Sequence, residues 1–166
     1  MSGTNTTNEQ LQATAHIDAA PDAVFAFLCT PANHQHTEPT DWVRDAITTE
    51  PINAKGQTFG VHMYLEQAGG HYDMHNVVTE FEQGRTIAWL PGTLGEDGTH
   101  QPGGWWWRYD IEPDANDAGN TGSRVTLTYD WSGTPSEVRD EIGGMPPFPR
   151  EYLDSSLAKL GNALSS

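Results

Sequence analysis

The sequence predicts an α+β fold in which a curved antiparallel sheet of about six to seven strands wraps around one long C-terminal helix. Two observations support this prediction. In the middle of the chain, polar and apolar residues alternate over successive segments, as they do in half-buried strands. Near the C-terminus the spacing becomes helical, and one apolar stripe is formed by Leu153, Leu157, Leu160 and Leu164. A single amphipathic helix then has to cover the apolar face of the sheet.

The first part of the chain predicts one strand followed by two short helices. Leu11–Asp18 alternates apolar with polar residues, which indicates a strand. Pro21–Cys29 begins with a proline, which the first turn of a helix tolerates, and continues with an apolar helical face. Pro31–Gln35 begins a second short helix, whereas His36–Asp41 is interpreted as a polar loop before a strand around Trp42–Thr48.

A hairpin is predicted next, from Gln57–Glu66 and His71–Glu82. The glycine pair between these segments suits a two-residue turn, because glycine readily adopts positive φ angles. Pairing Ala68 with His71 sets a register in which the facing pairs are Leu65 with Met74, Met63 with Asn76, and Val61 with Val78. This register gives both strands an apolar face on the same side of the sheet.

Two aromatic strands follow a short strand at Arg85–Leu90 and a glycine-rich loop at Pro91–Gly103. The aromatic strands are Gly104–Glu112 and Arg124–Trp131, and both alternate with period two. The segment between them is rich in glycine, asparagine and aspartate, as hairpin loops are. A short helix is expected at Thr134–Ile142, because its start combines a capping-box pattern with a proline at the first helical position.

The predicted inward faces carry large aromatic side chains and a few polar groups. With Trp105 and Trp107 inward, Trp106 and Arg108 point outward, unless a β-bulge reverses the parity. Such a face forms either the core of a small protein or the wall of a ligand cavity. The candidate ligand-binding residues on it are Phe59, Met63, Tyr72, Met74, Asn76, Trp89, Trp105, Trp107, Tyr109, Tyr129 and Trp131.

Composition restricts the expected partners. The chain of 166 residues carries 23 acidic against 8 basic residues, a formal net charge of −15. A field of that sign repels phosphate groups, so we expect neither nucleic acid nor an anionic membrane surface as a partner. A single cysteine, no signal peptide and no membrane-spanning stretch favour a cytoplasmic protein. Residues 1–10 are interpreted as a disordered tail and residues 11–166 as a single domain.

Other chemistry-bearing residues receive structural interpretations. His71, Asp73 and His75 resemble a metal motif, but the two histidines lie about 13 Å apart along a strand, so one ion cannot bind both. We therefore expect no metal site, and we expect no cofactor. Cys29 is interpreted as a buried structural cysteine, because a nucleophilic cysteine needs a base and an electropositive setting. No carboxylate or histidine is clearly placed on the inward face to act as a base.

Four segments resemble a known family: Ala13–Leu28, Thr30–Asn33, Val77–Trp89 and Ser155–Leu164. They are similar to the first strand with its Ala-Pro junction, the second short helix, the central strand–turn–strand and the long terminal helix of the START-like, or SRPBCC, superfamily. Within it the chain looks like the polyketide cyclase/dehydrase and lipid-transport proteins. The resemblance covers nearly the whole chain past residue 10. It implies a helix-grip fold enclosing a cavity, which the candidate residues would then line.

The resemblance leaves the activity open between two main functions. The first is binding of a hydrophobic, aromatic or lipid-like small molecule by a monomer or homodimer. The alternative is a cofactor-independent polyketide cyclase, aromatase or dehydratase acting on a carbonyl compound in the same cavity. Relatives of that kind often use a cavity arginine, which an outward Arg108 does not supply, and the absence of an inward base also favours binding. A third role, protein interaction as among some relatives, predicts a filled interior and an exposed apolar patch.

Overall fold

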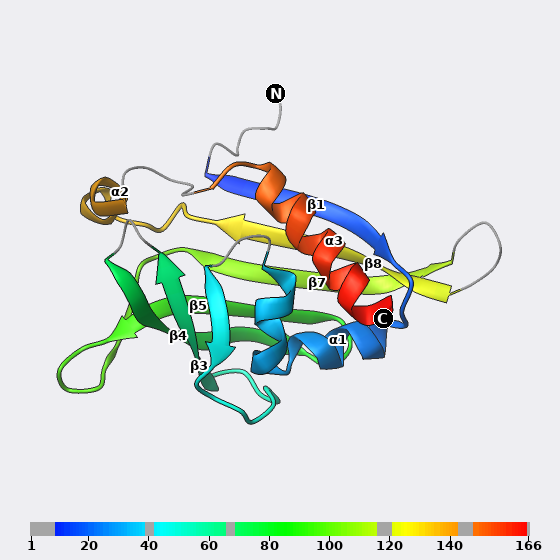
Figure 1. The fold of residues 1–166 in the computed structure, drawn as a ribbon, viewed down its shortest axis with the longest axis horizontal. Coiled ribbons are helices and arrows are strands. Elements are labelled where there is room, and N and C mark those ends of the chain that lie inside the picture. The colour runs from blue at the N-terminus through cyan, green and yellow to red at the C-terminus, as the bar shows by residue number, and fades with distance from the viewer. Residues whose placement is uncertain (1–8, 39–41, 66–68, 116–120, 143–147, 166) are drawn as a thin grey trace.

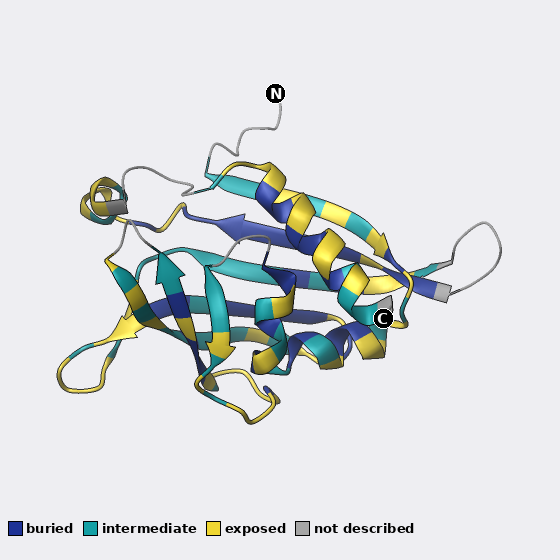
Figure 2. Cartoon of the chain, viewed as in Figure 1, coloured by how far each residue is buried: buried dark blue, intermediate teal, exposed yellow. Residues whose placement is uncertain are grey.

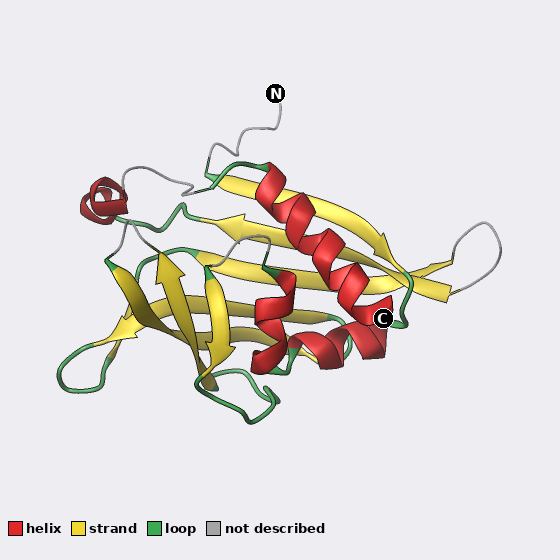
Figure 3. Ribbon diagram, viewed as in Figure 1, coloured by secondary structure: helices red, strands yellow, loops and turns green. Residues whose placement is uncertain are grey.

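The computed structural model describes residues 9–38, 42–65, 69–115, 121–142 and 148–165. Within them an antiparallel sheet combines with helices, which confirms the predicted α+β architecture (Figure 3). In chain order the elements are β1 (Gln10–Ile17), α1 (Pro21–Leu28), the 3₁₀ helix η1 (Pro31–Thr37), β2 (Val43–Ala46), β3 (Thr58–Leu65), β4 (Gly70–Glu82), β5 (Thr86–Leu94), β6 (His100–Pro102), β7 (Trp106–Ala115), β8 (Thr121–Asp130), α2 (Ser136–Ile142) and α3 (Glu151–Ser165). None of the described helices is both long and apolar enough to cross a membrane.

The strands form one curled sheet in the order β1-β8-β7-β5-β4-β3-β2, with β6 paired to β5. Figure 1 shows α1 and α3 lying against the same face of this sheet. Helix α3 contacts β1, β8 and η1, and α1 contacts β7 and β8. This is the predicted helix-grip arrangement, in which the sheet curves around the terminal helix.

Helix α3 is held on the sheet by its apolar stripe. Leu153, Leu157 and Leu160 are at most 1% exposed, and they belong to one core cluster with residues of β1 and β8 such as Ile17 and Leu127. The opposite side of α3 is exposed, so buried and exposed residues alternate along the helix in Figure 2. Because burial of apolar area is the main driving force of folding, this stripe fixes the helix on the sheet.

The predicted register of the β3–β4 hairpin is wrong. Leu65 pairs with Gly70 rather than with Met74, a displacement of four residues along β4. Among the described residues, β3 ends at Leu65 and β4 begins at Gly70. The predicted partner Ala68 lies outside the described residues. Side chains alternate between faces with period two, so an even displacement leaves the same residues on the inner face.

The predicted glycine-rich loop Pro91–Gly103 is largely a second hairpin. Strand β5 continues through the proline to Leu94, and β6 returns antiparallel to it. Gly92 permits this close pairing, since a Cβ atom at that position would lie 2.5 Å from the backbone oxygen of Gln101. The glycines therefore allow strands to approach, a role that composition alone does not separate from loop flexibility.

The predicted disordered tail overlaps the first strand. Residues 1–8 lie outside the described residues, but Gln10 is already part of β1 and pairs with Asp130 of β8. Its side-chain amide also donates a hydrogen bond to the Asp130 carboxylate at 2.9 Å. Strand β1 therefore begins one residue earlier than the alternation of Leu11–Asp18 predicts.

Candidate functional site

A cavity of about 90 Å³ lies between the inner face of the sheet and the helices η1 and α3. Its apolar lining is Val43, Val61, Met63, Met74 and Pro91. Its aromatic lining is Trp42, Trp89, Trp107, Tyr109 and Tyr152. Its polar lining is His34, Thr37, Glu38, Asn76 and Ser156. The sheet supplies most of the apolar and aromatic side chains, whereas η1, the residue after it and α3 supply most of the polar ones.

The structure brings only part of the predicted inner face to the cavity. The predicted residues that line it are Met63, Met74, Asn76, Trp89, Trp107 and Tyr109. Phe59, Tyr129 and Trp131 are buried in the hydrophobic core instead, and Trp105 is partly buried against that core. Tyr72 is half-buried, and its hydroxyl oxygen accepts a hydrogen bond of 2.6 Å from Nε1 of Trp42.

The alternation of β7 follows the predicted parity without a bulge. Trp107 and Tyr109 line the cavity, whereas the Arg108 side chain lies on the other face, 39% exposed. There its Nε donates to the Asp110 carboxylate at 2.9 Å. This hydrogen bond is the main reason why the pKa of the Arg108 guanidinium is raised. Arg108 therefore does not act inside the cavity.

The polar residues contributed by η1 were not predicted, and the expectation that no carboxylate or histidine faces inward is wrong. The first two residues of the segment interpreted as a polar loop, His36 and Thr37, still belong to the 3₁₀ helix η1. Successive turns of a 3₁₀ helix place every third residue on one side. Accordingly Pro31, His34 and Thr37 are all buried, and Glu38 follows them into the cavity lining at 5% exposure. The spacing of three residues between Pro31, His34 and Thr37 is the sequence signal that could have predicted these inward positions.

The Glu38 carboxylate accepts a hydrogen bond from the Tyr152 hydroxyl of α3. Burial raises the pKa of Tyr152 well above its usual range, and the negative charge of Glu38 raises it further. Burial likewise raises the pKa of Tyr109 to about 12, although its hydrogen bonds with Ser156 and Thr37 act in the opposite direction. Both phenols therefore keep their protons near neutral pH, and the Tyr152 hydroxyl donates its hydrogen bond to the carboxylate.

His34 is a neutral side chain in the cavity lining. Its Nε2 lies 2.7 Å from the carbonyl oxygen of Leu28, so Nε2 carries the proton and donates it to that oxygen. The ring stacks on Trp89 with a centroid distance of 5.1 Å and meets Phe59 edge-on at 5.4 Å. Burial lowers the pKa of His34, because an imidazolium ion loses its hydration there.

Aromatic side chains surround Tyr152. Trp42 lies 6.0 Å from it and Trp107 lies 6.4 Å from it, measured between ring centroids. Phe148 stacks on Tyr152 at 4.5 Å and on Trp107 at 5.7 Å. These contacts lock the ring of Tyr152 in place, so its hydroxyl and the Glu38 carboxylate occupy a fixed position in the cavity wall.

The residues interpreted structurally from the sequence lie away from the cavity. On the outer face, His62 and Asp73 lie opposite one another on β3 and β4, with Nδ1 2.8 Å from the carboxylate oxygen. Over the described ranges, no three His, Cys, Asp or Glu side chains group closely enough to hold a metal ion. Cys29 is buried, and burial raises its pKa to about 11, so the thiol stays protonated at neutral pH.

Comparisons with known proteins show the fold. No protein-family profile and no curated protein matches the chain. A solution structure of a protein from Arthrobacter aurescens matches at 16% identity and a TM-score of 0.66, over 98% of this chain and 89% of that one. A crystal structure of a protein from Nitrosomonas europaea matches at 16% identity and a TM-score of 0.65, over 96% of both chains.

A third similar structure is the Aha1 dimer from Colwellia psychrerythraea, at 15% identity and a TM-score of 0.55, over 93% of this chain and 95% of that one. Identities this low show a shared fold and nothing about the ligand or activity. The predicted curled-sheet fold is thus confirmed, while membership of the START-like superfamily stays a prediction.

Proposed function

We propose that this protein binds a small, largely apolar molecule in the cavity between the curled sheet and α3. The observation that carries the proposal is the composition of the cavity wall, in which aromatic and aliphatic side chains surround a small polar cluster. Ligand sites are commonly built this way, because apolar walls supply affinity and a few polar groups fix orientation. A purely structural core has no need to place Glu38 and Asn76 in such a wall, since burying polar groups is costly.

The cavity volume restricts the size of the ligand. At about 90 Å³ the cavity is several times larger than the ~10–15 Å³ that one water molecule needs. It is smaller than the ~300–1,000 Å³ of pockets for drug-sized ligands. The ligand is therefore at most the size of a single aromatic ring with a short side chain, rather than a lipid with long acyl chains.

Two neighbouring tryptophans provide the test. Trp107 lines the cavity, whereas Trp106 lies on the other face of β7 and does not line it. Isothermal titration with 2-phenylethanol, a neutral one-ring compound, should give a dissociation constant that Trp107→Ala changes by about tenfold and Trp106→Ala leaves unchanged within about twofold. Absence of binding at millimolar concentration, or equal effects of both variants, would contradict the proposal.

A second candidate function is cofactor-independent chemistry on a carbonyl compound, as in a cyclase, aromatase or dehydratase. The observation that favours it is the Glu38 carboxylate beside the protonated phenols of Tyr152 and Tyr109. In such a step Glu38 accepts a proton from the carbon next to the carbonyl, and a phenol donates a hydrogen bond to the enolate oxygen. Both groups would act by orientation and proton transfer alone.

Deuterium exchange distinguishes this enzyme from a binding protein. In D₂O, 4-phenyl-2-butanone should exchange the hydrogens next to its carbonyl faster with the protein than without it, as followed by NMR. Glu38→Gln should abolish the acceleration while the protein stays folded, because an amide cannot accept the proton. Exchange at the background rate with the wild-type protein rejects the enzymatic candidate and leaves binding in place.

A further inference from the structure

We infer that the cavity selects an organic ammonium ion, an amine joined to one aromatic ring, over neutral and anionic molecules of the same shape. The inference rests on the proposed binding function and specifies the class of ligand. Three features of the cavity support it: a buried carboxylate, a surplus of hydrogen-bond acceptors at the polar end, and aromatic rings around that end.

The charged side chain in the cavity lining is acidic. Among the described lining residues, Glu38 is the one carboxylate, and there is no arginine or lysine. Because Glu38 is only 5% exposed, it acts through a medium of low dielectric, where an ion pair with a ligand is stronger than in water. A charge-assisted hydrogen bond from an ammonium group to a carboxylate is stronger than one between neutral groups.

Three hydroxyl hydrogens at the polar end are already donated within the protein, while the lone pairs of those hydroxyls remain. Ser156 donates to the backbone oxygen of Thr37 at 2.8 Å, and Thr37 donates to the backbone oxygen of His34 at 2.9 Å. Tyr152 donates to Glu38. A hydroxyl that has donated its hydrogen still accepts hydrogen bonds. The polar end therefore accepts more readily than it donates, and an ammonium group, with three donors and no acceptor, complements it.

Aromatic rings surround Tyr152, whose hydroxyl donates to Glu38. The indoles of Trp42 and Trp107 flank Tyr152, the ring whose hydroxyl contacts Glu38, at centroid distances of 6.0 and 6.4 Å. A cation within about 6 Å of an aromatic centroid is attracted by the ring quadrupole, most strongly by tryptophan. The same rings also pack against the apolar body of the ligand, so one wall recognises both parts.

The charge of the whole protein acts in the same direction. With a formal net charge of −15, the chain attracts cations and repels anions before either reaches the cavity. This long-range effect is not specific to the cavity and is screened by salt. It therefore has to be separated from the local effect of Glu38.

The experiment compares three one-ring ligands by isothermal titration: 2-phenylethylamine, 2-phenylethanol and 3-phenylpropionate. Wild-type protein should bind the amine about tenfold or more tightly than the alcohol, and the carboxylate most weakly. Glu38→Gln should remove the advantage of the amine and change the affinity for the alcohol by less than about threefold. Glu112→Gln is the matched control, because Glu112 lies on the outer face and pairs with Arg124 at 2.7 Å. It removes the same charge and should leave all three affinities unchanged.

The outcomes separate the inference from the proposed function. If the alcohol binds as tightly as the amine, the ammonium inference is wrong, whereas ligand binding stands. If none of the three ligands binds, the proposed function fails for ligands of this size, and the inference fails with it. If Glu112→Gln weakens amine binding as much as Glu38→Gln does, the long-range field explains the preference and the cavity does not. The comparison of amine with alcohol in the wild-type protein needs no variant. It therefore tests the ammonium inference even if Glu38→Gln does not fold.

Discussion

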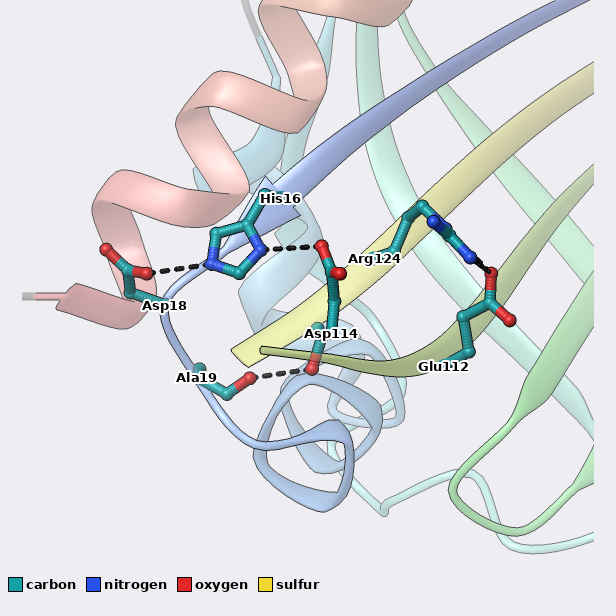
Figure 4. Close-up of polar contacts among 7 residues, drawn as sticks. His16, Asp18, Ala19, Glu112, Asp114 and Arg124 are labelled. Atoms are coloured by element: carbon teal, nitrogen blue, oxygen red, sulfur yellow. Dashed lines mark hydrogen bonds and ion pairs between the residues drawn. The ribbon is translucent and has the colours of Figure 1, made fainter. Parts of the chain in front are cut away.

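The two faces of β7 and β8 place polar side chains in opposite environments. On the outer face, charged residues form cross-strand pairs in contact with solvent, such as Arg124 with Glu112 at 2.7 Å. His16 of β1 lies between Asp18 and Asp114 in the same region, with contacts of 2.9 and 2.8 Å (Figure 4). On the inner face of the same strands, Tyr109 and Tyr129 are buried among aromatic rings.

The same type of contact has a different energetic weight on each face. An exposed ion pair contributes ~0–1 kcal/mol, because water solvates both partners when the pair is broken. A buried polar group that loses its partner costs ~1–3 kcal/mol. Outer polar residues are therefore replaceable, whereas inner ones such as Glu38 and His34 need a structural or functional reason to be present. The comparison points to the cavity as the place where function constrains the sequence.

The largest difference in stability is expected between substitutions on the buried side and on the exposed side of α3. Leu157→Asp puts a charge at a position that is 1% exposed and should lower the free energy of unfolding by about 4 kcal/mol or more. Ala158→Asp adds the same charge to the exposed side of the helix and should change stability by less than about 1 kcal/mol. Urea unfolding followed by circular dichroism measures both. An unchanged midpoint for Leu157→Asp would show that α3 does not cover the core.

Alanine substitutions of the two tryptophans of β7 should also differ in how much stability they remove. Trp107→Ala removes a ring that packs on Tyr129 at 4.4 Å and should cost about 3 kcal/mol, at the lower end of the range for buried aromatics because one side faces the cavity. Trp106→Ala should cost less than about 1 kcal/mol, since that half-buried ring lies on the outer face. Thermal melting of both variants measures the difference, and a reversed order would overturn the assignment of the two faces.

A single hydroxyl group should test the inner polar contact. Tyr152→Phe keeps the aromatic packing but leaves Glu38 without this donor, which should cost about 1–3 kcal/mol. Thr14→Val is the outer counterpart, because it breaks an exposed hydroxyl pair with Thr126 at 3.1 Å and should cost less than about 0.5 kcal/mol. Equal losses in urea unfolding would mean that the contact with Glu38 is no more important than an exposed hydrogen bond.

Histidines on the two faces should respond to pH with opposite signs. Burial lowers the pKa of His34 from 6.5, so below about pH 6.5 the unfolded chain takes up a proton that the folded chain excludes. Stability is then lost as the pH falls from 6.5 through the folded pKa. His34→Gln should flatten this part of the stability–pH curve, measured by urea unfolding between pH 5 and 7.5. An unchanged slope would show that another group causes the acid sensitivity.

The parts of the molecule that sequence predicted are those set by local periodicity. Alternation placed Trp107 and Tyr109 inside and Arg108 outside, and the structure has the same parity. Even the wrong register of the β3–β4 hairpin left the inner face intact, because the displacement was an even number of residues. Helical spacing of leucines was sufficient to predict α3 as the helix that covers the sheet.

The polar end of the cavity is not a local property of the chain. Tyr152 and Glu38 are 114 residues apart, and their contact depends on how α3 packs against η1. A short 3₁₀ helix has a period close to three and few residues, so its inward positions are easily read as a polar loop. Sequence therefore predicted the walls that the sheet supplies, including Asn76 and Tyr109, and missed the polar groups that η1, Glu38 and α3 contribute.

The smallest effect expected is at His16 on the outer face. Hydrogen bonds with Asp114 and Asp18 raise its pKa above 6.5, so the folded chain holds the proton more tightly than the unfolded chain. The resulting stabilisation is fully present below pH 6.5 and is lost as the pH rises through the folded pKa, the opposite of His34. His16→Gln should therefore lower the urea midpoint slightly at pH 5.5 and not at pH 8.5. The decrease in the urea midpoint at pH 5.5 should be smaller in high salt, because the site is exposed and salt screens its charges. An equal shift at both pH values would attribute the effect to packing rather than to the proton.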